Sequence, residues 1–154
     1  MSEDKDVINF KGLKALTSLL ENDELRTKIG ILGAKNLRNT DPNKTNAGIG
    51  AKHEFGDSEV PRRSFLRVPL ADNLFSYIES SKSFNKELVD ECLEEGTLKP
   101  LYLKMGVIAE TVILDAFESG GFGKWKPSNM KYKKNHQTLV ETQQLRNSIT
   151  SEVV

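Results

Sequence analysis

The feature that most constrains this fold is a long apolar segment, residues 100–119, followed directly by two glycines. Apolar residues recur there at helical spacing, and further ones widen the stripe over much of the circumference. Such a helix must be covered on several sides, so we expect it to form the centre of the core. The stripe comprises Leu101, Met105, Ile108, Val112 and Phe117, broadened by Leu103, Val107, Ile113 and Leu114.

Shorter helices and two short strands are predicted around this segment. β-Branched runs at 28–33 and 149–154 indicate strands, and apolar periodicity with capping residues indicates the helices. Because strand and helix do not alternate regularly, we expect an α+β fold, with a small, mostly antiparallel sheet packed by the long central helix and shorter helices. The shorter helices are expected at 9–27, at 47–55 (ended by Gly56), after an Asp72 cap, and from a Ser83 cap to Gly96, with 57–69 extended.

The size of the chain fits one domain. Its 154 residues predict a single unit spanning 1–154, in which 1–8 and 36–46 are mobile. The hydrophobic fraction of 37% is low for a globule that stabilises itself alone. Two explanations stay open: a small core, or stability supplied in part by neighbouring subunits.

Charge is balanced overall but uneven along the chain. The 22 basic and 22 acidic residues give no global field that would draw the protein to nucleic acid or membrane. Residues 84–95 carry five acids and one lysine, whereas residues 120–150 carry six bases and one acid. Opposite poles allow copies to stack or to form a ring, and two solvated faces are the equally open alternative.

No targeting or membrane segment is predicted. The first six residues include three acids and are not followed by the apolar segment of a signal peptide. No apolar run is long enough to span a bilayer. We therefore expect no membrane contact, and a location in the cytoplasm or in a particle assembled there.

Catalytic, cofactor and metal sites are not expected. The single cysteine, Cys92, excludes an internal disulfide and a multi-cysteine metal site. His53 precedes Glu54 but has no second histidine four residues on, and His136 lies in a basic stretch. The glycine-rich run at 119–124 lacks a phosphate-loop hydroxyl, since Trp125 stands in that place. A metal-dependent hydrolase centred on His53 and Glu54 stays open as a rival, and it would require bound metal that is lost on His53→Ala. We expect instead a protein that is not an enzyme, in which Glu54 caps or pairs locally and Phe55 anchors in the core.

The basic stretch 124–134 gives an alternative function. Lysines interleaved with Trp125 and Tyr132 have the composition of a nucleic-acid contact. Lysines near an aromatic residue are also common on ordinary surfaces, so the signal is weak. A small nucleic-acid-binding protein would use Lys126, Lys131, Lys133 and Lys134.

Two separated segments suggest a docking function. Residues 54–56 read Glu-Phe-Gly, and residues 60–67 read Val-Pro-Arg-Arg-Ser-Phe-Leu-Arg. The second segment is Leu-Val-Glu-Thr-Gln-Gln-Leu-Arg-Asn-Ser-Ile-Thr at 139–150, preceded by Trp-Lys-Pro at 125–127. A tight glycine turn, a rigid proline and aromatics among arginines suit a loop that binds another protein.

In these segments the chain resembles the tail-completion, or neck, proteins of tailed bacteriophages, of the lambdoid minor tail protein Z and tail-component type. Members carry Glu-Phe-Gly, then Ile/Val-Pro-x-Arg-Pro-Phe-Leu-Arg, a long helix, a Trp/Pro loop, a lysine and Leu-Ile-Asp-Thr-Gly-Gln-Leu-x-x-Ser-Ile-Thr. With the strand at 29–33, the likeness covers about three quarters of this chain in consistent order. The departures are Ser64 for Pro, Glu141 for Asp and Gln143 for Gly.

The resemblance implies a structural virion protein at the head–tail junction. It would form a ring of copies, six-fold to match the tail tube, and contact the tail terminator or tube and the head connector, with DNA contact only indirect. Its loop would be a stiff docking arm, although Phe65 and Leu66 could equally fill the chain's own core. Thr142 would cap the turn at 143–146. The implied interface residues are Phe55, Pro61, Arg62, Arg63, Phe65, Leu66, Arg67 and Trp125.

Overall fold

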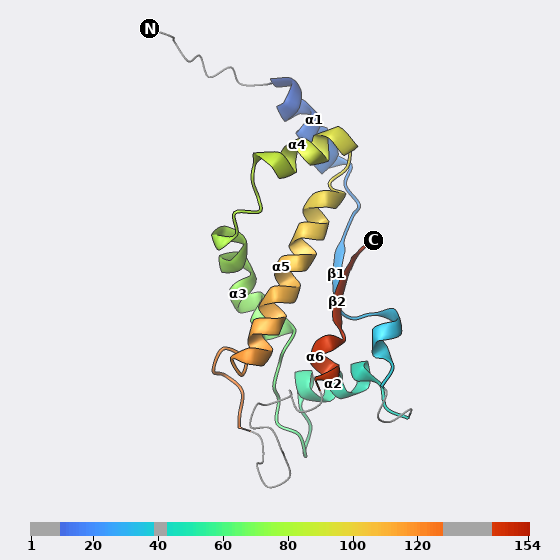
Figure 1. Cartoon of the computed structure of the whole chain (residues 1–154), viewed down its shortest axis with the longest axis vertical. Coiled ribbons are helices and arrows are strands. Elements are labelled where there is room, and N and C mark those ends of the chain that lie inside the picture. Colours follow the sequence, from blue (N-terminus) through green and yellow to red (C-terminus); the bar gives the residue numbers. More distant parts are fainter. Residues whose placement is uncertain (1–9, 39–42, 128–142) are drawn as a thin grey trace.

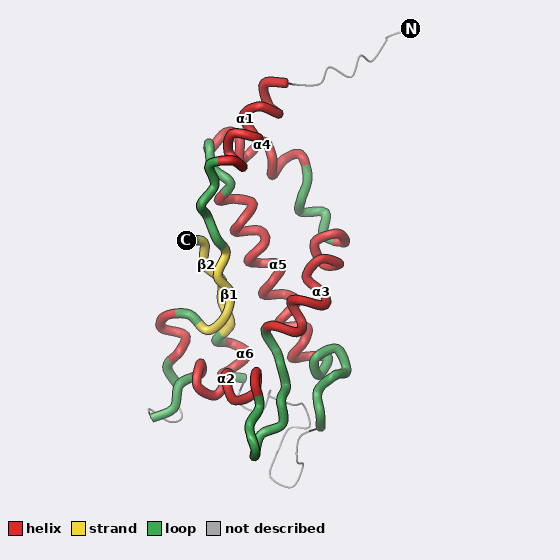
Figure 2. The backbone as a smooth tube through the Cα atoms, turned by 180° about the vertical axis from the view of Figure 1, so that it is seen from behind, coloured by secondary structure: helices red, strands yellow, loops and turns green. Residues whose placement is uncertain are grey.

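The computed structural model describes residues 10–38, 43–127 and 143–154, and it confirms the α+β class. Helix α5 runs along the middle of the molecule, between α3 on one side and the β1–β2 sheet on the other (Figure 1). Helices α1 and α4 lie at one end, and α2 and α6 lie at the other (Figures 1 and 2). The elements are α1 (Phe10–Glu21), β1 (Thr27–Ile31), the 3-10 helix η1 (Gly33–Asn36), α2 (Asn46–Phe55), α3 (Arg67–Ser80), α4 (Lys86–Glu95), α5 (Lys99–Glu118), α6 (Gln144–Asn147) and β2 (Ile149–Val153).

The predicted central helix is confirmed as α5. Its buried residues include Ile108, Val112, Ile113 and Phe117, the last three almost fully enclosed. The predicted widening of the buried stripe is only partly correct. Leu103 and Val107, which were predicted to widen the stripe, are 50% and 58% exposed. The sheet and α3 cover two sides of α5, which leaves a third, apolar side open.

The two strands form an antiparallel pair in which Ile29 lies opposite Ser151. Side chains of directly opposite residues share one face of a sheet. The face holding this pair lies against α5, because the Ser151 hydroxyl donates to Glu110 at 2.6 Å. Gly106 permits the close approach: a Cβ there would lie 2.5 Å from the Ser151 hydroxyl oxygen. The other face carries Lys28 and Glu152, whose charged atoms are 4.0 Å apart.

Several element boundaries differ from the sequence prediction. Helix α1 ends at Glu21 rather than 27, and an aspartate turn follows, in which Asp23 accepts from the Leu25 amide at 3.1 Å. Asn85, not Ser83, caps α4 by accepting from the Leu88 amide at 3.1 Å. Helix α3 begins at Arg67, five residues before the predicted Asp72 cap. Gly56 and Gly96 do end α2 and α4, with φ of 72° and 65°.

The expected mobile segments are only partly described. Residues 1–8 lie outside the described residues, as do 39–42. In the rest of 36–46, Leu37 and Thr45 form an isolated β-bridge, and Thr45 caps α2 by accepting from the Gly48 amide at 3.0 Å. The mobility of both segments stays a prediction.

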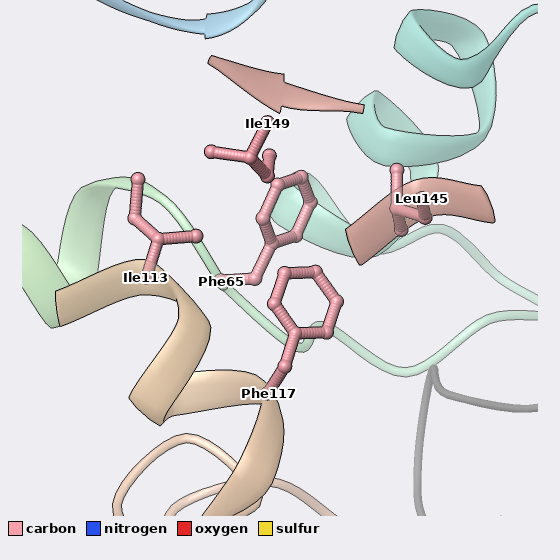
Figure 3. Packing of buried hydrophobic residues seen from close by; sticks show 5 residues of the cluster. All are labelled: Phe65, Ile113, Phe117, Leu145 and Ile149. Atoms are coloured by element: carbon pink, nitrogen blue, oxygen red, sulfur yellow. The ribbon is translucent and has the colours of Figure 1, made fainter. Parts of the chain in front are cut away.

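The core joins the two separated sequence segments. Phe65, which precedes α3, packs with Ile113 and Phe117 of α5 and with Leu145 and Ile149 near the C-terminus (Figure 3). The Phe65 and Phe117 ring centroids are 5.3 Å apart. Residues more than 80 positions apart in sequence thus share one cluster.

The turn before α6 is formed and strained, although Gln143 stands where the resembled family has glycine. Gln143 has a φ of 54°, a conformation that costs a residue with a Cβ about 1 kcal/mol or more. The expected Thr142 cap lies outside the described residues. Gln143→Gly should therefore raise the free energy of unfolding by about 0.5–1 kcal/mol, measured by urea denaturation. Gln144→Gly, one residue further and helical, should lower it; equal effects would contradict the strain.

Among the described residues, no helix combines the length and apolar character needed to cross a membrane.

Candidate functional site

The centre of the candidate site is the carboxylate of Glu54, which caps α3 from another helix. Its side chain is buried and accepts the amides of Phe65 and Leu66, both at 3.0 Å, and of Arg67 at 3.2 Å. The Ser64 hydroxyl donates to it at 2.6 Å, and the Arg67 guanidinium does so at 3.1 Å. These amides are the ones that a helix start leaves without partners. Glu54 was expected to cap or pair locally. It both caps α3 and pairs with Arg67, but the capped amides lie 11 to 13 residues further along the chain.

The rest of the first turn of α3 is satisfied by its own sequence. The Ser64 hydroxyl oxygen accepts from the Val68 amide at 3.0 Å while it donates to the carboxylate. Pro69 has no amide hydrogen to satisfy. The Leu70 amide then begins the helical pattern by donating to the Leu66 carbonyl at 3.2 Å. A serine at 64, where the resembled family has proline, thus has a specific structural role.

Hydrogen bonding keeps Glu54 ionised. Burial alone raises the pKa of this carboxyl, but hydrogen bonds from Ser64, Leu66 and Arg67 outweigh it and hold the pKa below the ordinary glutamate value. A carboxylate beside a helix start is also favoured by the helix dipole. The site therefore carries a fixed negative charge at neutral pH, balanced by Arg67.

The loop between α2 and α3 folds back on α2 rather than projecting from it. Asp57 accepts the amides of Glu59 and Val60 at 2.8 and 2.7 Å, which closes a tight turn. The Arg63 amide donates to the His53 carbonyl at 2.7 Å. Gly56 is required at the bend, because a Cβ there would lie 2.8 Å from the backbone nitrogen of residue 62. The expected extended docking arm is thus held against its own chain.

The prediction that Arg63 is an interface residue is wrong, because its side chain forms hydrogen bonds within the chain. Its guanidinium donates to the Lys126 carbonyl at 2.9 Å and to the Pro127 carbonyl at 3.0 Å, and its side chain is buried. Burial lowers the pKa of this arginine. Trp125 secures the same segment, since its indole N–H donates to the Ser64 carbonyl at 2.9 Å.

The prediction that Phe65 is an interface residue is also wrong. It is 3% exposed, so it fills the chain's own core and has no surface to offer a partner. The alternative, that Phe65 fills the chain's own core, is confirmed. Leu66 is half-buried and packs against this core.

Some residues of the predicted interface are exposed and lie around a shallow apolar cavity. Phe55 is 60% exposed rather than anchored in the core, and the Arg67 guanidinium lies 4.6 Å from its ring centroid. These two residues and Leu66 help to line a cavity of about 240 Å³ between α2 and the end of β1. Arg62 is exposed and Pro61 is half-buried. Partner binding by these residues stays a prediction.

The predicted DNA-contacting lysines are mostly not described. Lys131, Lys133 and Lys134 lie outside the described residues. The Lys126 side chain is exposed, while its carbonyl holds Arg63. Neighbouring Lys124 pairs with Asp72 of α3 at 2.5 Å.

No constellation for metal binding is found among residues 10–38, 43–127 and 143–154, where no three His, Cys, Asp or Glu side chains gather. His53 uses its carbonyl to hold the loop, and His136 is outside the described residues. Cys92 is buried.

One buried polar group escaped the sequence analysis. The Asn46 amide donates to the Lys35 carbonyl at 2.8 Å and the Leu37 carbonyl at 3.2 Å, and its oxygen accepts from Arg38 at 2.9 Å. Asn46 thereby fixes η1 against the start of α2. From the sequence, residue 46 was predicted to lie in a polar loop, because polar composition alone does not show that a side chain is buried.

Comparison of the chain with protein-family models, with curated proteins and with solved structures gave no match.

Proposed function

We propose that this chain is a structural protein of a tailed-phage virion, which forms a ring at the head–tail junction and joins the tail's upper end to the connector. Its role is assembly rather than catalysis. The observation that supports this proposal is the convergence of the resembling segments: Glu54, Phe65 and Leu145 meet around one core and one helix cap. The motif residues thereby have defined structural roles in this fold.

The exposed apolar surface supports an assembly role. Phe55 at the end of α2, and Leu103 and Val107 on α5, are each at least half exposed. Leu103 and Val107 lie one helical turn apart, so they form a contiguous apolar patch, and such patches are typical of interaction surfaces. A small core assisted by neighbours also agrees with the low hydrophobic fraction of 37%.

Disruption of the gene in the phage that encodes the chain tests the proposal. We expect filled heads and tails that fail to join, or tails of faulty length, seen by electron microscopy. Supplying the intact gene in trans should restore infectious particles. Infectious, correctly joined particles that lack the polypeptide would overturn the proposal. Salt-sensitive DNA binding by the purified chain, together with such particles, would favour the nucleic-acid alternative.

A further inference from the structure

We propose that a second copy of this chain extends the sheet, with the outer edge of β1 in one copy paired antiparallel to the outer edge of β2 in the next. The inference rests on the proposed function and deepens it by naming the surface through which copies join. Because the two edges differ, the contact is head-to-tail, and repetition of it closes a ring if the rotation between copies allows.

Both edges carry unpaired backbone groups. Arg26 and Val154 exchange two backbone hydrogen bonds, at 2.8 and 2.9 Å, which sets the alternation along the pair. Counting from the Arg26–Val154 pair, every second residue forms hydrogen bonds with the other strand. The residues between them point their N–H and C=O groups away from that strand, towards the outer edge. No described residue accepts from or donates to these outward groups. They belong to Thr27, Ile29 and Ile31 of β1 and to Ile149, Ser151 and Val153 of β2.

The two edges match each other in length and register. Each strand has five residues, with three outward-facing positions. If β1 meets the next copy's β2 in the register found within the chain, Ile29 of one copy exchanges hydrogen bonds with Ser151 of the other. Lys28 then lies opposite Glu152 in a pair without hydrogen bonds, where Cα atoms are about 4.5 Å apart.

Charge selects this arrangement over symmetric ones. Within the chain, Lys28 and Glu152 already face each other on the solvent side, and both are more than half exposed. The head-to-tail contact repeats the same attraction between copies. Pairing of β1 with β1 over all five residues places Lys28 opposite Gly30, and pairing of β2 with β2 places Glu152 opposite Thr150. Neither symmetric contact forms the attraction between Lys28 and Glu152, and each brings two like charges to diagonal positions. Like charges on neighbouring strands destabilise a sheet.

An exposed apolar stripe lies beside the β2 edge. Gly106 of α5 faces the sheet, and Glu110, about 40° further round the helix, bonds to Ser151 of β2. Tyr102, about 40° round in the opposite direction, accepts from the Thr27 hydroxyl of β1 at 2.8 Å through its carbonyl. Rotation from Gly106 towards Glu110 therefore leads away from β1 and towards the β2 side. Leu103 and Val107 lie about 60° and about 100° round from Gly106 in the same direction. They are the exposed apolar residues of α5, and a copy joined at β2 would cover them.

The spacing of the strands agrees with helix packing. Strands in a sheet are about 4.8 Å apart, so a two-stranded unit repeats about every 9.6 Å. Packed helices lie about 8–10 Å apart. Addition of one copy to the β2 edge therefore brings its α5 layer to packing distance from Leu103 and Val107.

Charge reversal in the full-length protein tests the pairing. Lys28→Glu and Glu152→Lys should each weaken self-association about tenfold per contact, measured by sedimentation equilibrium. An equimolar mixture of the two variants should recover association, because copies that alternate in a ring then place opposite charges at positions 28 and 152 of every junction. Each variant alone has lost the same intrachain pair, so recovery on mixing reports contacts between copies.

Three results would overturn the inference: wild-type protein that stays monomeric at millimolar concentration, single variants that associate like wild type, or a mixture that does not recover. If the wild-type protein completes particles and both single variants complete them equally well, the edge pairing fails while the proposed function stands. Absence of the chain from joined particles removes the function itself.

A second pair of variants tests the covering of α5. Val107→Lys should weaken association at least tenfold, because it places a charge in the covered stripe. Leu13→Lys on α1, a substitution at a residue 56% exposed against 58% for Val107, should leave association unchanged. Equal effects of the two substitutions would contradict the location of the contact. Far-ultraviolet circular dichroism checks that both variants fold.

Discussion

Glu54→Ala should lower the free energy of unfolding by about 3 kcal/mol or more, one of the two largest effects expected in this chain. The substitution removes the acceptor for three amides at the start of α3 and for the Ser64 hydroxyl. These donors lie in a site where the carboxylate is 4% exposed, so water does not readily replace it. Loss of a buried acceptor that serves several donors costs more than loss of one exposed cap.

Two variants separate the cap from general effects of charge. Glu54→Gln keeps the shape and one acceptor oxygen but turns an amide group towards amide donors, and we expect about 2 kcal/mol of destabilisation. Glu59→Ala removes an exposed acid from the loop beyond Gly56 and should change stability by less than about 0.5 kcal/mol. Urea denaturation measures all three. If Glu54→Ala and Glu59→Ala prove equally stable, the carboxylate does not hold α3.

The stability contributed by Glu54 should depend on pH. Its pKa in the folded chain lies below the ordinary value of 4.5, because hydrogen bonds to the ionised form outweigh burial. The contribution is therefore fully present above the unfolded pKa and is lost as pH falls through the folded pKa. The difference in unfolding free energy between wild type and Glu54→Gln should be constant near neutrality and shrink below about pH 4.5. A difference that grows in acid would contradict the assigned shift.

The elements that the sequence predicted well have local causes. Helix α5 follows from apolar periodicity, and the ends of α2 and α4 follow from Gly56 and Gly96, since glycine tolerates positive φ. The start of α3 was misplaced because its cap comes from Glu54, which lies on another helix. A capping signal based on neighbouring residues cannot reveal a carboxylate that lies 13 residues before the first residue of the helix.

The sequence analysis named residues of the candidate site but did not predict which of their side chains face inward. The pattern of proline, arginines and aromatics singled out residues 54–67, yet whether an apolar side chain there faces inward depends on contacts distant in sequence. Phe65 turned inward because Leu145 and Ile149 complete its cluster, whereas Phe55 lies outside beneath Arg67. Arg63 is inside because the carbonyls of residues 126 and 127 accept its hydrogen bonds. None of these partners is visible from the local sequence.

Phe65→Ala should lower the free energy of unfolding by about 3–5 kcal/mol, as expected when a phenylalanine is removed from a packed core. The side chain is 3% exposed and lies against Phe117, with ring centroids 5.3 Å apart. The Ile113, Leu145 and Ile149 side chains around it come from α5 and from the C-terminal segment, so they cannot close the space by moving together.

Phe55→Ala is the matched control, because it removes the same ring ten residues earlier in the chain. Its side chain is 60% exposed and its ring contacts the Arg67 guanidinium, so we expect a loss of about 1 kcal/mol or less. Thermal and urea denaturation of the two variants measure the contrast. If Phe65→Ala were nearly neutral while Phe55→Ala unfolded the chain, the assignment of core and surface would be reversed. The expected order instead leaves Phe55 at the end of α2 and Arg67 at the start of α3 as exposed residues of the predicted interface.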